Sequence, residues 1–246
     1  MEEYGPETYG ERIAEVYDDW FHPPTSAEET VEFLAELAGG GPVLELAIGT
    51  GRIALPLAAR GIEVHGIDAS EAMVAKLRAK PGGDDIPVTI GDFADVGVEG
   101  RYRLIAIVFN TLWALLTQED QGRCVRNVAE HLTADGVFVT EMYVPDPARF
   151  DRGQRVQVRD VESRRVVLET SKHDPEHQRV SSQLIALEDG GGISMFPVEL
   201  RYIWPSELDL MAELAGLRLR ERWGGWKREP FEPTGWCISV FEPATA

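Results

Sequence analysis

The stretch Glu45-Leu46-Ala47-Ile48-Gly49-Thr50-Gly51 follows directly on the apolar residues Val43 and Leu44. A short apolar run that ends in paired glycines is typical of a strand that turns into a helix, because glycine permits the tight turn and lets a ligand approach the backbone. The stretch therefore predicts the first strand of an α/β fold and a ligand-binding edge at its carboxyl end.

Strands and helices alternate downstream of this turn. Further strands are expected where apolar residues run together, at 62–67, 86–90, 102–109, 137–142, 217–223 and 236–241. Helices are expected between them, for example over residues 118–131. Alternation of this kind predicts a doubly wound, mainly parallel, seven-stranded Rossmann-like sheet in which the last two strands are antiparallel.

The chain divides into three parts by pattern. Residues 1–41 predict two helices, one through Ile13–Trp20 and one through Val31–Leu37, that form part of an active-site cover. Residues 42–144 and 204–246 predict the cofactor-binding core. Residues 145–203 alternate without a convincing helix, so we expect an antiparallel β insert that either covers the substrate or faces a second copy in a homodimer.

Composition excludes several classes of protein. The formal net charge of −18 over 246 residues disfavours a phosphate backbone, so no nucleic-acid partner is expected. No run approaches a membrane span, and the two cysteines lack metal-ligand spacing, so a cytoplasmic protein without a membrane partner is expected. His173 and His177 are separated by Asp174-Pro175, which predicts a turn rather than a metal pair; no metal is expected.

Two ligand classes compete for the glycine-rich turn. Gly49, Gly51 and Ala54 satisfy the G-x-G-x-x-A form of the dinucleotide fingerprint, and Asp68 stands where an acid holds a ribose. A carboxylate at Glu45, however, opposes a pyrophosphate and suits a cationic amino-acid portion. A further acid, Asp92, follows the third strand. The acids together favour an adenosine that carries a positive charge.

With these residues the sequence resembles the class I S-adenosylmethionine-dependent methyltransferases, and more narrowly the small-molecule branch that includes the sugar-amine N-methyltransferases of antibiotic pathways. The resemblance covers roughly residues 9–143 and rests on the 45–51 stretch, on Gly66-Ile67-Asp68-Ala69-Ser70-Glu71-Ala72-Met73 and on Gly91-Asp92-Phe93. It implies S-adenosyl-L-methionine as the cofactor.

The resemblance also implies roles for single residues. The glycines would line the methionine part, Asp68 would bind the ribose hydroxyls, and Met73 would pack on adenine. Asp92 with Phe93 would contact the adenine edge, and Tyr9 or Tyr17 would close over the cofactor. The residues expected to bind the cofactor are Tyr17, Glu45, Ala47, Gly49, Gly51, Asp68, Ala69, Met73, Asp92, Phe93 and Phe109.

The methyl acceptor is less visible in the sequence. A bulky small molecule is expected, because many aromatic residues lie near the site or beyond residue 200. The resemblance implies that this molecule belongs to specialised metabolism. Transfer to nitrogen, oxygen or sulfur would proceed mainly by proximity and orientation. Candidate catalytic groups are His22, Asn110 and Tyr143, with Glu141 as a further candidate base. Two other functions stay open: an NAD-dependent oxidoreductase, and a non-catalytic metabolite-binding protein on the same fold.

Overall fold

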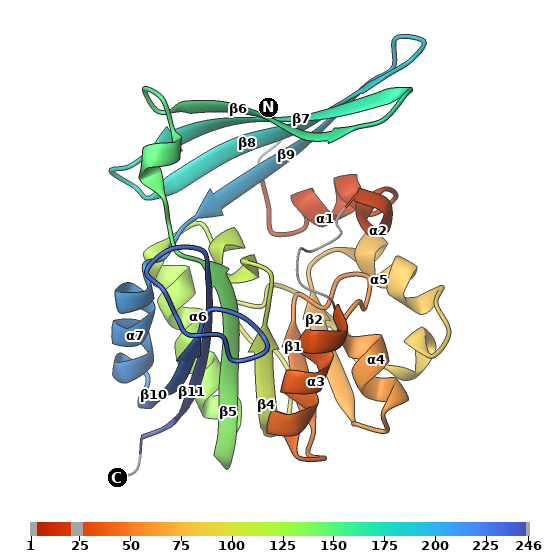
Figure 1. The fold of residues 1–246 in the computed structure, drawn as a ribbon. Helices are drawn as coiled ribbons and strands as arrows, with labels where there is room; N and C mark the ends of the chain where they lie inside the picture. Colours follow the sequence, from red (N-terminus) through yellow and green to blue (C-terminus); the bar gives the residue numbers. More distant parts are fainter. Residues whose placement is uncertain (1–3, 21–26, 245–246) are drawn as a thin grey trace.

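Two β-sheets make up the framework of the molecule (Figure 1). The computed structural model describes residues 4–20 and 27–244. The larger sheet has seven strands in the order β10-β11-β5-β4-β1-β2-β3. In chain order they are β1 (Val43–Leu46), β2 (Val64–Asp68), β3 (Val88–Ile90), β4 (Tyr102–Ile107), β5 (Leu132–Tyr143), β10 (Leu217–Trp223) and β11 (Trp236–Pro243).

The pairing in this sheet confirms the predicted fold class. Strands β1 to β5 pair in parallel, whereas β11 pairs antiparallel with both β5 and β10. The central strands read as continuous apolar runs because both of their faces are covered. All four residues of β1 are buried, for example. Because strands β1 to β5 are parallel, their carboxyl ends meet at one edge of the sheet, which we call the crest.

Helices cover both faces of the sheet. The helices that follow the N-terminal segment are α3 (Ala27–Ala38), α4 (Ala54–Ala59), α5 (Glu71–Arg78), α6 (Gln118–His131) and α7 (Pro205–Leu214). Three short 3₁₀ turns also occur, η1 (Gly83–Asp85), η2 (Thr111–Ala114) and η3 (Pro147–Arg149). One core cluster includes Val128 of α6 and Leu208 of α7, and another includes Leu34 of α3 and Leu57 of α4.

The prediction of a single helix through Ile13–Trp20 was wrong. The structure contains two short helices, α1 (Thr8–Ile13) and α2 (Tyr17–Trp20), separated by a turn in which Val16 N–H donates to the Ile13 carbonyl at 3.0 Å. This break lets Asp18 reach the glycine-rich turn. A tertiary contact thus overrides the local helical periodicity.

Residues 154–201 form the second sheet, which is antiparallel throughout and lies above the crest (Figure 1). Its strands are β6 (Gln154–Val161), β7 (Arg165–Asp174), β8 (Arg179–Glu188) and β9 (Ile193–Arg201). Figure 1 shows α1 and α2 between this sheet and the end of β2. The second sheet and the N-terminal helices therefore lie above the crest in Figure 1.

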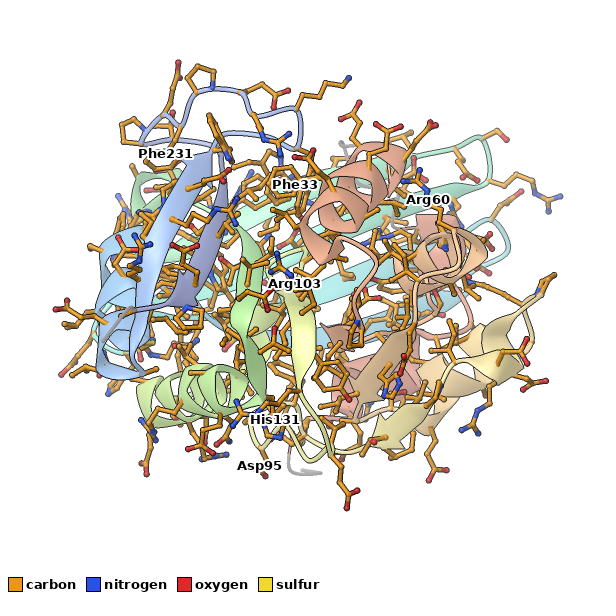
Figure 2. All side chains as sticks on the ribbon, turned by 90° about the horizontal axis from the view of Figure 1, so that it is seen from below. Phe33, Arg60, Asp95, Arg103, His131 and Phe231 are labelled. Atoms are coloured by element: carbon orange, nitrogen blue, oxygen red, sulfur yellow. The ribbon has the colours of Figure 1, made fainter. Side chains whose placement is uncertain are left out.

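The opposite end of the larger sheet carries no part of this site. Arg103 is the second residue of β4 and His131 ends α6, and the view from below in Figure 2 places both at that end. There the Nδ1 atom of His131 lies 2.7 Å from the Asn127 carbonyl oxygen, and its Nε2 atom lies 3.0 Å from that of Val98. Among the described helices, none has the length and apolarity that a membrane span requires.

Candidate active site

The turn after β1 has the geometry of a ligand cradle. Ala47, Gly49 and Gly51 have positive φ angles of 55°, 57° and 81°. A Cβ placed on Gly51 would lie 2.2 Å from Leu77 Cδ1, so this glycine lets α5 pack closely. A Cβ on Gly49 would approach nothing nearer than the Ala47 carbonyl oxygen at 3.9 Å. The turn is therefore tightly packed on one side and open on the other, where a ligand can approach the backbone.

Asp68 joins the glycine-rich turn to the start of α5. Its carboxylate accepts hydrogen bonds from Gly49 N–H at 2.7 Å and from Ser70 N–H at 2.9 Å. Ser70 in turn caps α5, because its hydroxyl accepts from Met73 N–H at 3.1 Å. Burial raises the pKa of Asp68. The side chain that the sequence assigned to a ribose thus stands at the crest and also holds the turn.

A buried acid, Glu45, and a half-buried cation, Arg52, lie near each other at this turn. Glu45 is 4% exposed, and burial raises its pKa to about 8 while the positive charge of Arg52 lowers it. Within the described residues, Glu45 Oε2 and one guanidinium nitrogen of Arg52 are buried without a hydrogen-bond partner. The Arg52 guanidinium lies 4.6 Å from the centre of the Phe109 ring. Sequence reasoning missed Arg52, although an arginine directly after Gly51 was a visible signal.

Glu141, on β5, has a structural role, and its function as a base stays a prediction. One carboxylate oxygen accepts from Phe109 N–H at 2.7 Å and the other from the Trp226 indole N–H at 2.9 Å. Phe109 and Asn110 both have a φ of 61°, a conformation that is costly for residues other than glycine. The Asn110 side chain accepts from Tyr143 N–H at 2.5 Å. Asn110 therefore helps to fix the turn after β4 and lies beside Tyr143, a second candidate catalytic residue.

The N-terminal helices are attached to the crest by polar contacts. The Glu11 carboxylate accepts from the Ser70 hydroxyl at 2.9 Å and from Ala72 N–H at 3.0 Å. Asp18 accepts from the Thr50 hydroxyl at 2.6 Å and pairs with Lys80 at 2.6 Å.

Tyr9 and Tyr17 lie half-buried within this segment. Burial raises the pKa of the Tyr17 phenol, the positive charge of Arg52 lowers it, and the negative charge of Asp68 raises it. The segment therefore brings Tyr17 near Arg52 and Asp68 at the crest, and contact of Tyr9 or Tyr17 with a cofactor stays a prediction.

The other expected cofactor residues lie along the same edge. Met73 is 4% exposed and packs in a cluster with Ile13 and Leu184, which joins α5 to α1 and the second sheet. Phe93 is 7% exposed in the main core, and Asp92 accepts from Ala94 N–H at 2.8 Å. Ala69 is half-buried beside Asp68. Whether any of these side chains touches the cofactor stays a prediction.

The histidines show no metal site in the parts of the chain that the structure describes. His22, a candidate catalytic group, lies outside the described residues. His173 stacks on Phe150 with ring centres 4.6 Å apart, and His177 pairs with Asp174 at 2.8 Å. Over residues 4–20 and 27–244 no group of three or more histidine, cysteine or acidic side chains is placed to hold a metal ion.

A cleft between the end of β5 and the second sheet is the candidate acceptor site. It measures about 300 Å³, counting the part open to solvent. Its walls are Trp113, Tyr143, Val144, Pro145, Asp146, Pro147, Arg149, Phe150, Val180 and Tyr202. Trp113 is 6% exposed, and its indole N–H is buried without a partner among the described residues. Tyr143 stacks on Trp236 with ring centres 3.7 Å apart.

Arg149 lies on the cleft wall together with the acid Asp146, and further charges of both signs surround it. Burial, together with the charges of Arg155 and Arg159, lowers the pKa of Arg149. The charges of Arg149 and Arg159 lower the pKa of the Tyr143 phenol, whereas burial and the charge of Glu141 raise it. The sequence did not single out these arginines, because their proximity depends on how the second sheet lies over the crest.

Comparisons with known proteins agree with this geometry. The family described as "Methyltransferase domain" matches residues 43–136. The solved structure of the CcbJ methyltransferase from Streptomyces caelestis is 43% identical, covers 98% of this chain and 100% of its own, and superposes with a TM-score of 0.93.

Two further relatives are named for N-methylation. A cypemycin N-terminal methyltransferase from Streptomyces sp is 27% identical over 92% of this chain and 93% of its own. A dTDP-4-amino-2,3,4,6-tetradeoxy-D-glucose N,N-dimethyltransferase from Saccharopolyspora spinosa is 30% identical over 56% of this chain and 57% of its own.

Proposed function

Because the chain belongs to the class I S-adenosylmethionine-dependent methyltransferases, of the small-molecule branch, we propose that it methylates an amine nitrogen on a bulky natural product. Its cofactor is S-adenosyl-L-methionine. The chain is thus an enzyme, and the NAD-dependent oxidoreductase and the non-catalytic binding protein are set aside. What we propose is the acceptor atom, an amine nitrogen, and the acceptor class, a bulky natural product.

The residues at the crest fit the cofactor. The turn is open above Gly49, where a backbone approach is needed. The unpartnered oxygen of Glu45 suits the cationic amino group of the methionine part. Asp68 stands at the end of β2, where its carboxylate can accept from the ribose hydroxyls. These three residues would hold the methionine part and the ribose.

When bound, S-adenosylmethionine supplies a methyl group on a sulfonium, which the acceptor lone pair takes as the C–S electrons return to sulfur, leaving S-adenosylhomocysteine and a methylammonium that releases one proton. The protein's own part is orientation. The turn of Phe109 and Asn110, fixed by Glu141, forms the boundary between the cofactor end and the acceptor cleft. Holding the two reactants in line can contribute about 7–11 kcal/mol to the lowering of the barrier.

Nitrogen is favoured over oxygen by the state of the candidate bases. Each oxygen of Glu141 already accepts one N–H donor, the Asn110 oxygen accepts from Tyr143 N–H, and His22 lies outside the described residues. A hydroxyl benefits from a base in the transition state, whereas a neutral amine attacks through its lone pair and loses its proton afterwards. The two relatives named for N-methylation support the same choice.

The cleft supports a bulky acceptor with an oxygen or anionic substituent. The indole N–H of Trp113 is a buried donor without a partner in the described structure, so an acceptor oxygen there would satisfy it. The Arg149 guanidinium on the cleft wall adds positive charge. The aromatic walls provide the apolar area that a sugar ring or a planar scaffold would cover.

Methyl transfer from S-adenosylmethionine labelled in its methyl group tests the proposal. The acceptors are an aminodeoxysugar glycoside, a peptide with a free N-terminus and a panel of amine-bearing natural products. Each is paired with its N-acetylated form as the matched control. We expect label in at least one free amine and none in its acetylated partner.

Label in a phenol, an alcohol or a thiol from a parallel panel without amines, with none in any amine, would overturn the choice of nitrogen. Trp113→Phe keeps the aromatic wall and removes the donor. For an acceptor with an oxygen near the amine, this variant should raise KM about 10-fold or more and leave affinity for S-adenosylhomocysteine unchanged.

A further inference from the structure

A cluster of four polar side chains lies where the second sheet joins the core. It consists of Gln121 of α6, Gln178 directly before β8, Arg201 at the end of β9 and Glu207 of α7. Gln121 is 0% exposed and Arg201 6%, and the other two are half-buried. Figure 1 shows the chain passing at this place from β9 into α7. We call these four residues the junction cluster.

The guanidinium of Arg201 connects the second sheet to two helices of the core. Its Nη1 donates to Gln121 Oε1, and its Nη2 donates to Gln178 Oε1 at 2.9 Å and to Glu207 Oε1 at 2.8 Å. Burial raises the pKa of Glu207, but hydrogen bonds from Gln178 and Arg201 and the charge of Arg201 lower it to below its usual value. Arg201 and Glu207 are therefore a charged pair at neutral pH.

Gln121 extends the junction cluster to the 3₁₀ turn η2. Its Nε2 donates to the carbonyl of Leu115 at 3.0 Å and to that of Arg201 at 2.9 Å, and it lies 3.4 Å from the carbonyl oxygen of Leu112. Leu112 and Leu115 stand on either side of Trp113 in the chain. The orientation of the amide is fixed, because its oxygen accepts from a guanidinium while its nitrogen faces carbonyl oxygens. Gln121 thus holds the backbone around Trp113.

Gln178 holds the residue that follows Arg201 in the chain. The N–H of Tyr202 donates to the Gln178 carbonyl at 2.9 Å, and the Tyr202 carbonyl accepts from Gln178 Nε2 at 3.0 Å. Gln178 itself has a φ of 55°, which is costly for a residue other than glycine. Its contacts with Tyr202, Arg201 and Glu207 maintain this conformation. Both backbone groups of Tyr202 are therefore fixed by one residue of the junction cluster.

The two residues held in this way both line the acceptor cleft. Trp113 and Tyr202 are among its walls, and their ring centres lie 6.2 Å apart. No member of the junction cluster is itself a wall of the cleft in the described structure. A buried ion pair adds little net stability over apolar residues of the same size, but each of its hydrogen bonds has a direction. The distinctive effect of the junction cluster is therefore on the orientation of the two rings.

We propose that Arg201 and Gln121 are positioning residues for the methyl acceptor, which they affect only through Trp113 and Tyr202. This inference rests on the proposed function, which takes the cleft as the acceptor site. Without either side chain, η2 and the connection from β9 to α7 would shift, and the indole N–H of Trp113 would no longer point at a bound oxygen. The hydrogen bonds of the junction cluster reach no residue of the glycine-rich turn among the described residues, so binding of the cofactor should not change.

Two variants test the proposal against a matched control. Arg201→Met removes the guanidinium, and Gln121→Glu keeps the size of the side chain but replaces its donor by an acceptor. The control is Arg222→Met, because Arg222 also pairs with an acid of α7, Asp209, at 2.9 and 2.5 Å, but connects it to β10 outside the cleft. All three variants should lose stability, as a merely structural role also requires.

Kinetics with the amine that takes label in the panel above separate positioning from structure. Arg201→Met and Gln121→Glu should raise the KM of this acceptor about 10-fold or more, whereas Arg222→Met should leave it unchanged. Affinity for S-adenosylhomocysteine should stay at the wild-type value in all three variants, which also establishes that they are folded. If Arg201→Met does not fold, Gln121→Glu alone provides the test.

A second measurement needs no acceptor, so it remains decisive if the choice of an amine is wrong. In the ¹⁵N–¹H spectrum the indole signal of Trp113 is the one that Trp113→Phe removes. It should shift in Arg201→Met and Gln121→Glu and stay in place in Arg222→Met. The indole of Trp226, which donates to Glu141 at 2.9 Å, is the internal reference and should not move. A Trp113 signal unchanged in both variants, or shifted equally by Arg222→Met, would overturn the proposal.

Discussion

The carboxylate of Glu141 accepts the backbone N–H of Phe109 across 2.7 Å, and so connects β5 to the turn that follows β4. Phe109 and Asn110 there share a left-handed conformation, which costs about 1–2 kcal/mol for each residue. The second carboxylate oxygen holds Trp226 of the β10–β11 loop. A single buried side chain thus joins the turn after β4 to the β10–β11 loop.

Replacing Glu141 should therefore cost stability. Glu141→Ala leaves the Phe109 N–H and the Trp226 indole N–H buried without partners, and each such group costs about 1–3 kcal/mol. We expect a loss of about 2–5 kcal/mol in the free energy of unfolding, measured with urea. Glu130→Ala, an exposed acid on α6, is the matched control and should change it by less than about 0.5 kcal/mol. A loss below about 1 kcal/mol at Glu141 would contradict its role.

Alanine substitutions at Gly49 and Gly61 test the cofactor contact of the glycine-rich turn, because both introduce the same kind of backbone strain. Both have a positive φ, 57° and 78°, and neither has an atom closer than 3.9 Å to an added Cβ. Gly49→Ala and Gly61→Ala should each lower the free energy of unfolding by about 1–2 kcal/mol. Only the methyl group of Gly49→Ala would project where the cofactor approaches. Calorimetry should therefore show S-adenosylhomocysteine binding weakened about 10-fold or more by Gly49→Ala alone; equal affinities would place the cofactor elsewhere.

Local sequence patterns predicted several of the elements that position the site. The helix over Gln118–His131 and the strand over Leu217–Trp223 lie where periodicity predicts them. The serine cap at Ser70 and the acid at Asp68 also follow from neighbouring residues, because strand ends and helix starts are encoded within a few positions.

Local sequence patterns could not predict the contacts between residues that are far apart in the sequence. Asp18 and Thr50, like Phe109 and Glu141, are 32 residues apart in sequence, and Trp226 lies 85 residues from Glu141. No period of 2 or 3.6 residues encodes a contact of that kind. Arg52 is different, because it lies only seven residues after Glu45 and directly follows Gly51, so the sequence offered a signal that was overlooked.

Stability should depend on pH through Glu45. Its pKa in the folded protein is about 8, whereas the ordinary value is 4.5. Between these values the unfolded carboxyl is ionised while the folded one keeps its proton, so the free energy of unfolding falls as pH rises from about 4.5 to about 8 and then levels off. Asp68 and Glu141 have pKa values raised by burial and act in the same direction.

Glu45→Gln isolates this contribution, since the other two acids remain. Urea unfolding at about pH 5 and about pH 8 should show a larger loss for the wild type than for Glu45→Gln, by up to about 1.4 kcal/mol per pH unit. The exposed Glu130→Gln should behave as the wild type. Equal losses in the wild type and Glu45→Gln would mean that Glu45 is ionised in the folded protein throughout this range.

The attachment of α2 to the glycine-rich turn should control the release of the cofactor. Asp18 contacts both the Thr50 hydroxyl and Lys80, and Lys80 also donates to the Thr50 carbonyl at 2.8 Å. Asp18→Ala removes two of these contacts from a partly exposed position, so the free energy of unfolding should change by no more than about 1 kcal/mol. The N-terminal helices would then open more often. The dissociation rate of S-adenosylhomocysteine, followed by stopped-flow tryptophan fluorescence, should rise about 10-fold.

The control for this variant lies on the same segment. Glu15 pairs with Lys76 at 2.6 Å, a distance equal to that between Asp18 and Lys80, but Lys76 lies on α5 and outside the glycine-rich turn. Loss of a surface ion pair alone would affect Glu15→Ala and Asp18→Ala equally. A faster dissociation in Asp18→Ala alone assigns the effect to the contact with Thr50. Equal rates in the two variants and the wild type would mean that the cofactor leaves by a path that does not require α2 to move.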